Sequence, residues 1–199
     1  MSHQISFFIA LVAGVVLVSQ VRPDARVASA VYMASLTSLF GVSALYHRPK
    51  WSPAARARMR KLDHASIFLL ISGTYTPFCL MLPPDTGHLL LAVMWGAAAL
   101  GVFRALFWIN APKPIVAVLA LAMGWVAIAY RSEFARVLGP SNMVLLIAGG
   151  ILYSAGALAY ALKRPALWPR VFGYHELFHA FTIVAALCHF VIVCRILIP

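Results

Sequence analysis

Seven long apolar runs, separated by short polar or proline-containing segments, limit most strongly what this chain can fold into. A membrane-spanning helix needs about 20 apolar residues, so seven such helices take about 140 of the 199 residues. Only 11% of the residues are charged, against about 25% in soluble domains. This composition excludes a soluble globular enzyme, and the runs are too long for the strands of an outer-membrane barrel. The sequence predicts one all-α domain over 1–199, a bundle of seven transmembrane helices.

The expected helices follow from the apolar runs and from the proline, glycine and charged residues between them. No Lys or Arg precedes the first run, so we interpret that run as an uncleaved helix and not as a secretory signal. The predicted ranges are 4–21, 26–47, 62–82, 87–108, 114–130, 141–162 and 174–197.

Lys and Arg are unevenly divided between the two sides of such a bundle. The chain has 16 of them against five Asp and Glu, and 11 fall on the side of the N-terminus. Because Lys and Arg favour the cytoplasmic side, we predict a cytoplasmic N-terminus and an external C-terminus in the inner (plasma) membrane.

The excess of positive charge indicates a partner. In a membrane protein, basic loops face anionic lipid headgroups, so we expect such headgroups at the basic loop 48–61 and no nucleic acid. Within this loop, 54–61 could form a short interfacial helix. A role as topology determinant is the simpler interpretation, and the two are compatible.

Polar residues of three expected helices meet at one depth near the cytoplasmic face. His47 ends the second helix, Asp63 begins the third, and His175 and His179 lie one turn apart at the start of the last. An i, i+4 pair shares one helix face, so both imidazoles could bind one ion. Three histidines with an open fourth position form a catalytic zinc site. A hydrogen-bonded cluster that ties the helices together is equally compatible with these spacings.

Residues 175–179 also read H-E-x-x-H, a pattern in which Glu176 would be the general base of a metalloprotease. The usual third-ligand signature does not follow on this helix, and the Asp-containing motif of intramembrane proteases is missing from the sequence. We therefore do not favour a protease. His189 lies about 21 Å further along the same helix than His175, too far to share an ion, so packing or a hydrogen bond is expected there.

Five motifs together give the chain a family resemblance. They are SALYH over 43–47, KLDHASIFLLISGTYTPF over 61–78, AMGW over 122–125, GGILYSAGALAYALKRP over 149–165 and FGYHELFHAFTIVAALCHF over 172–190. In combination they resemble the haemolysin III family, the bacterial branch of the progestin and adipoQ receptors. The resemblance extends from the second expected helix to the last.

This resemblance implies a seven-helix membrane fold that holds zinc near the cytoplasmic leaflet. It implies zinc ligands at His47, His175 and His179, Asp63 as the holder of the zinc-bound water, and Ser43 beside them. Because some relatives are linked to ceramide hydrolysis, we expect a zinc-dependent hydrolase of a lipid amide or ester. Asp63 would accept the proton of the attacking water, and Ser43 would add a hydrogen bond to the developing oxyanion.

Other functions stay open at this point. The residues by themselves support only a metal site with an open position. A receptor-like or regulatory membrane protein with structural zinc, acting in membrane homeostasis, fits that site without any turnover. A cytolysin fits less well, because the chain resembles a resident multispan protein. The sequence indicates neither the substrate nor the oligomeric state.

Overall fold

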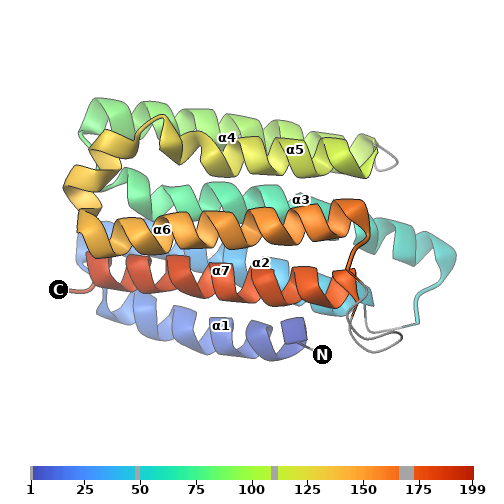
Figure 1. Ribbon diagram of the computed structural model, residues 1–199. Coiled ribbons are helices and arrows are strands. Elements are labelled where there is room, and N and C mark those ends of the chain that lie inside the picture. Colours follow the sequence, from blue (N-terminus) through green and yellow to red (C-terminus); the bar gives the residue numbers. More distant parts are fainter. Residues whose placement is uncertain (1, 48–49, 109–111, 166–172) are drawn as a thin grey trace. The chain divides into compact units, whose positions relative to one another are not determined.

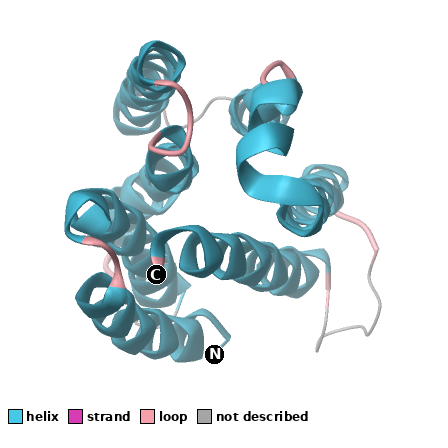
Figure 2. Ribbon diagram, turned by 90° about the vertical axis from the view of Figure 1, so that its left-hand side faces the viewer, coloured by secondary structure: helices cyan, strands magenta, loops and turns pink. Residues whose placement is uncertain are grey.

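The computed structural model describes residues 2–47, 50–108, 112–165 and 173–199, which form helices and turns and contain no strand (Figure 1, Figure 2). The predicted all-α class is thereby confirmed. The elements are α1 (Ser2–Gln20), the 3₁₀ turn η1 (Pro23–Ala25), α2 (Arg26–His47), α3 (Pro53–Cys79), α4 (Pro84–Phe107), α5 (Lys113–Gly124), the 3₁₀ turn η2 (Trp125–Ile128), α6 (Arg131–Leu162) and α7 (Tyr174–Leu197).

Five helical segments of the described chain are long and apolar enough to cross a membrane. They are Ser2–Gln20, Pro23–His47, Pro84–Phe107, Arg131–Leu162 and Tyr174–Leu197. The helix α3 falls outside this set because Asp63, His64 and several hydroxyl side chains lower its hydropathy. The apolar helical stretch Ile115–Ile128 is shorter than a full span. The number of seven spans and the orientation of the termini stay predictions.

The start of α3 differs most clearly from the sequence-based expectation. The helix begins at Pro53 and not at 62, so the basic segment 54–61 is helical and continuous with α3. The hydroxyl of Ser52 accepts a hydrogen bond from the N–H of Ala55 at 3.4 Å, and proline is favoured at the first helical position. Residues 48–49 of the basic loop lie outside the described part of the chain.

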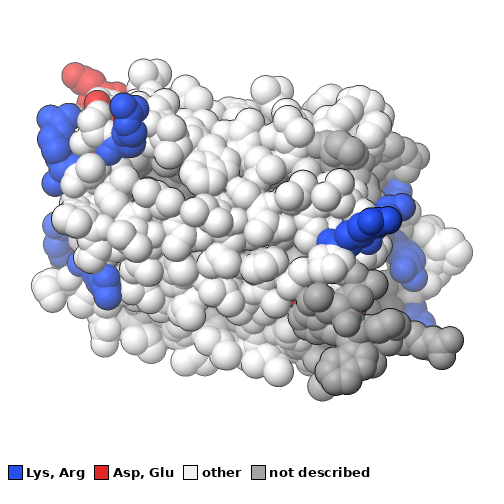
Figure 3. All heavy atoms as spheres, in the orientation of Figure 1, with Lys and Arg blue, Asp and Glu red and all other residues white. Residues whose placement is uncertain are grey.

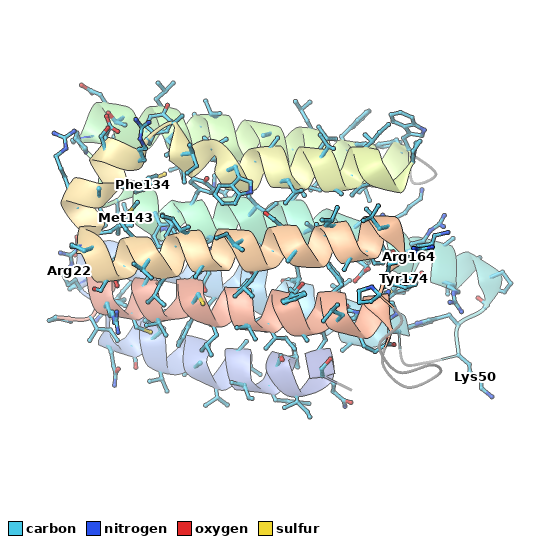
Figure 4. All side chains as sticks on the ribbon, viewed as in Figure 1. Arg22, Lys50, Phe134, Met143, Arg164 and Tyr174 are labelled. Carbon is cyan, nitrogen blue, oxygen red and sulfur yellow. The ribbon has the colours of Figure 1, made fainter. Side chains whose placement is uncertain are left out.

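The helix α6 begins ten residues before the expected start and contains a kink. Gly139 has φ 75° and ψ 169°, a conformation that glycine adopts without a Cβ penalty, and Pro140 follows it. Phe134 and Met143, labelled in Figure 4, lie on the two sides of this kink. The expected boundary at 141 therefore marks an interruption within α6, and a further helical segment precedes it.

The described chain divides into two compact units. The first unit comprises His3–Asn110 with Val193–Pro199 and contains α1 to α4 and the end of α7. The second unit comprises Ala111–Ile192 and contains α5, α6 and most of α7. A single functional domain over the whole chain stays a prediction.

In the first unit, α3 packs against both α2 and α4. Glycine allows close approach on each side: Gly73 lies against α2, and Gly101 of α4 lies against the ring of Phe68. The hydroxyl of Ser72 donates to the carbonyl oxygen of Met94 at 2.7 Å, which links α3 to α4 in the buried interior. These contacts fix which face of α3 is turned to each neighbour.

In the second unit, α6 is the common partner of the other helices. The indole Nε1 of Trp125 donates to the hydroxyl of Ser154 at 2.9 Å, which joins η2 to α6. Gly156 of α6 lies against Phe178 and Phe181 of α7, where a Cβ would meet side-chain carbon at 3.2 Å. The small residue thus allows α6 and the start of α7 to approach each other closely.

The surface of the helices fits a lipid environment. Large apolar side chains are exposed along them, for example Val12 at 66%, Leu100 at 73% and Val144 at 67%. On the face drawn in Figure 3, Lys and Arg gather near helix ends, and the stretches between those ends show no charged side chain. Exposed apolar surface of this extent is unfavourable in water and favourable in hydrocarbon.

Candidate functional site

The first turns of α7 bring His175 and His179 together. Their Nε2 atoms lie 2.8 Å apart, and the ring centroids are 4.6 Å apart. The i, i+4 spacing places both imidazoles on one helix face, as the sequence predicts. At this distance the Nε2–H of one ring can donate a hydrogen bond to the Nε2 of the other; with both Nε2 lone pairs free, the two nitrogens suit a shared metal ion.

The aromatic ring of Tyr160 supports this pair from α6. Its centroid lies 5.6 Å from the ring of His175 and 5.3 Å from that of Phe178. Arg164 lies two residues after the end of α6 and Tyr174 begins α7, and Figure 4 shows both at the same end of these two helices. Tyr160 therefore restricts the orientation of the His175 ring, a contact that sequence spacing did not indicate.

Glu176 has a structural role at the start of α7. Its Oε2 accepts a hydrogen bond from the backbone N–H of Gly173 at 2.9 Å. A carboxylate that reaches back three residues to the start of its own helix is half of a capping box, and its charge suits the positive N-terminal end. This contact explains Glu176 without a role as general base. The signal in the sequence was the Gly-x-x-Glu spacing.

In the first unit, a hydrogen bond joins Ser43 of α2 to Asp63 of α3. The Ser43 hydroxyl donates to the Asp63 carboxylate; Ser43 is buried and Asp63 is half-buried. His47 lies one turn after Ser43 and so on the same face of α2, and it is the more exposed of the two. The structure thus brings together two of the residues predicted for the chemistry and places a predicted ligand one turn away.

His189 packs within the second unit, away from any candidate metal ligand of its own helix. Its Nε2 lies 3.5 Å from the carbonyl oxygen of Leu146, its ring centroid lies 5.7 Å from that of Tyr153, and Gly149 of α6 makes room for it. The expectation of packing or a hydrogen bond at this position is confirmed.

Three histidine side chains carry ring nitrogens of the kind that bind metal ions. His47, His175 and His179 could hold a metal ion, with one ring nitrogen offered by each. Neutral imidazoles are common zinc ligands, and three of them leave one tetrahedral position open. His47 belongs to the first unit and the pair to the second, so their joint use by one ion is part of the proposed function.

Comparison with known proteins places the chain in a family. The family described as "Haemolysin-III related" matches residues 1–190. Haemolysin-3 of Bacillus cereus is 34% identical over 161 residues, which cover 80% of this chain and 70% of that protein. A haemolysin-3 homologue of Bacillus subtilis strain 168 is 32% identical over 123 residues, which cover 61% of this chain and 55% of that protein.

The family and the five apolar helices together establish a multi-pass membrane protein, and relatives from bacteria are consistent with the predicted inner (plasma) membrane. The match runs through every residue of the candidate site, from Ser43 to His179. This chain belongs to the haemolysin III family.

Proposed function

We propose that this protein is a zinc-dependent hydrolase that cleaves an amide or ester bond of a membrane lipid near the cytoplasmic leaflet. The observation that carries the proposal is the 2.8 Å approach of the Nε2 atoms of His175 and His179. His47 would complete a set of three neutral ligands with an open fourth position. The predicted common depth of the three helix ends supports the joining of His47 to the pair.

The residues present fit zinc and not a harder cation. Both nitrogens of the pair belong to imidazoles, which suit Zn²⁺, whereas Mg²⁺ and Ca²⁺ prefer oxygen ligands. When bound, zinc would supply a Lewis acid that lowers the pKa of water and stabilises negative charge on the acyl oxygen. The carboxylate of Asp63 would offset part of the charge of this cation.

Asp63 is the proposed proton acceptor. It takes the proton of the attacking water and returns it to the amine or alcohol that leaves, as a general base and then a general acid. The hydrogen bond from Ser43 holds one carboxylate oxygen of Asp63 and so restricts its orientation. Ser43 was expected at the oxyanion; its contact with Asp63 supports a role in positioning the carboxylate instead.

The lipid substrate is proposed from the surroundings of the site. Membrane lipids can reach the site from the bilayer along the exposed apolar helices. Because the proposed site lies near the cytoplasmic leaflet, the amide or ester bond to be cleaved must lie near the lipid headgroup. The basic first turns of α3 would hold anionic headgroups at the same membrane face. Arg56 and Arg58 in this segment are exposed, and the Arg56 guanidinium carbon lies 5.9 Å from the ring centroid of Tyr46.

A receptor-like or regulatory protein with structural zinc is the second candidate. The observation that favours it is the Ser43–Asp63 hydrogen bond, which ties α2 to α3 whether or not a reaction takes place. In that case zinc would hold helices in one arrangement, and no lipid would be consumed. The two candidates differ in turnover and not in metal content.

The test uses the full chain, purified with zinc and placed in lipid nanodiscs that contain a ceramide-type amide or a phospholipid ester. We expect wild-type turnover of one substrate, and Asp63→Asn should retain zinc and lose about 10²–10⁴-fold in rate. Asp24→Asn is the matched control, because the Asp24 side chain is 71% exposed. Wild-type turnover in Asp63→Asn would exclude our mechanism, and zinc-loaded wild type without turnover of either lipid would favour the regulator.

A further inference from the structure

Arg104, in the last turn of α4, is a charged residue whose side chain is buried. The residue is 8% exposed, and its Nε, Nη1 and Nη2 atoms are all buried without a hydrogen-bond partner among the residues that the structure describes. Within the described ranges it is the one Lys, Arg, Asp or Glu that is buried to this degree. Neither the proposed metal ligands nor the proton acceptor explains this side chain.

A guanidinium in such a place requires a partner. It stays protonated, and it presents five N–H donors that water or an anion normally satisfies. An unpaired buried charge is among the least favourable features that a fold can contain. An arginine near the end of a membrane helix usually extends its head to the interface. Arg104 lies one turn from the end of α4 and nevertheless keeps its guanidinium inside.

The nearby part of α3 offers no anion to Arg104. Gly101, one turn before Arg104, lies against Phe68, so Arg104 is level with the turn of α3 that precedes Phe68. That turn contains His64 and follows the basic Arg60 and Lys61. The carboxylate of Asp63 is turned to α2, where it accepts the hydrogen bond of Ser43. Arg60 and Lys61 therefore add positive charge on this side of α3, which would attract an anion from outside the chain.

The same helix presents a surface for acyl chains. Leu100 and Phe107, four residues before and three after Arg104, are each 73% exposed, and Phe103 is 61% exposed. The rings of Phe103 and Phe107 lie against each other with centroids 4.6 Å apart. A ligand with a charged head and apolar chains matches an arginine flanked by such residues better than a soluble ion does.

We propose that Arg104 turns its guanidinium from this enclosed position to the adjacent lipid-facing side of α4 and there binds the phosphate of an anionic membrane lipid whose acyl chains lie along Leu100, Phe103 and Phe107. The planar guanidinium can donate two parallel hydrogen bonds to two phosphate oxygens, which a lysine cannot do. The site is formed by residues of α4, which contributes none of the proposed metal ligands, and it does not depend on hydrolysis.

The experiment measures lipid binding and thermal stability of the full chain in detergent. The probes are phosphatidylglycerol, phosphatidylcholine and inorganic phosphate, each titrated into wild type, Arg104→Gln, Arg104→Lys and Arg131→Gln. Arg131→Gln is the matched control, since it removes the same charge from an exposed position outside the basic segment of α3. Binding is followed by native mass spectrometry, and the midpoint of unfolding is followed over the same titration.

We expect saturable binding of one phosphatidylglycerol to wild type, at least tenfold weaker binding to Arg104→Gln, and binding within twofold of wild type for Arg131→Gln. Arg104→Lys keeps the positive charge but cannot donate two parallel hydrogen bonds, so its affinity for phosphatidylglycerol should lie between those of wild type and Arg104→Gln. Without lipid, Arg104→Gln should unfold at the wild-type temperature or above it, because an unpaired buried charge has been removed. With phosphatidylglycerol the order should reverse, because the ligand stabilises only the protein that binds it.

Three results would overturn the proposal. Equal affinity of wild type and Arg104→Gln for phosphatidylglycerol would remove Arg104 from the site. Equal stabilisation by inorganic phosphate would show a soluble anion site and not a lipid site. A lower unfolding temperature of Arg104→Gln in detergent alone, unchanged by lipid, would show that Arg104 has a purely internal role. If Arg104→Gln does not fold, wild-type affinity in Arg104→Lys contradicts the bidentate contact.

Discussion

Replacement of Glu176 tests whether this residue caps α7 or performs chemistry. Glu176→Ala removes the hydrogen bond between Oε2 and the N–H of Gly173 and the negative charge in the first turn. Loss of a capping side chain costs about 1 kcal/mol, with a range of about 0.5–2 kcal/mol. Loss of the charge at the helix start adds about 0.3–1 kcal/mol. Because the Glu176 side chain is exposed, we expect the low end of both, about 1 kcal/mol in total.

Glu176→Gln separates the contribution of the capping hydrogen bond from that of the negative charge. Glutamine keeps an oxygen that can accept from Gly173, and it loses only the charge, so about 0.3 kcal/mol should be lost. Neither variant changes the ligand nitrogens of His175 and His179, so zinc content and any lipid hydrolysis should stay within about twofold of wild type. The free energy of unfolding is measured by denaturant titration in bicelles, zinc by elemental analysis, and hydrolysis in nanodiscs.

The pattern of effects decides between the two roles. If Glu176 were the base of an H-E-x-x-H site, Glu176→Gln would lower the rate of hydrolysis by about 10²–10⁴-fold. The free energy of unfolding would stay unchanged. That result would refute the capping interpretation and revive the protease alternative. The capping interpretation would be supported if Glu176→Ala lowers stability, Glu176→Gln recovers most of that loss, and both variants keep hydrolysis intact.

Two further predictions concern the metal and the membrane. His175→Ala and His179→Ala should each lose most of the bound zinc, because two neutral ligands hold the ion poorly; full zinc occupancy in the double variant would disprove the ligand assignment. Reporter fusions should place Arg56 in the cytoplasm and Arg195 outside, as the distribution of Lys and Arg predicts; an exported reporter at Arg56 would contradict both the orientation and the shared depth of the site residues.

Helix boundaries were predictable where one type of signal dominated. The ranges of α2 and α7 agree with the prediction at both ends, since Arg26 and Tyr174 directly precede apolar runs. The start of α3 was placed too late because four basic residues made the segment 53–61 resemble a loop. The Ser52-Pro53 pair was the better signal, and it is local in the sequence. The helical segment before Gly139 was missed because the proline that follows resembled a helix start.

The candidate site was predictable in part, for a geometric reason. The spacing of His175 and His179 determines that they share a face, whatever surrounds the helix. The contact between Ser43 and Asp63 depends on how α2 and α3 are rotated about their axes, which spacing within one helix does not determine. The contact between the tilted rings of Tyr160 and His175 depends on the small Gly156 one turn earlier, which lets α6 approach α7.

The five carboxylates of the chain bear on the role of Arg104. Each has a local interaction that uses its charge: Asp24 with Arg22, Asp63 with Ser43, Asp85 in the first turn of α4, Glu133 with Ser132 and Arg136, and Glu176 with Gly173. A chain with a net charge of +11 therefore keeps no acidic side chain in reserve for a buried guanidinium. This distribution supports the proposal that the anion at Arg104 comes from outside the protein, and phosphate headgroups are the anions that a membrane supplies in excess.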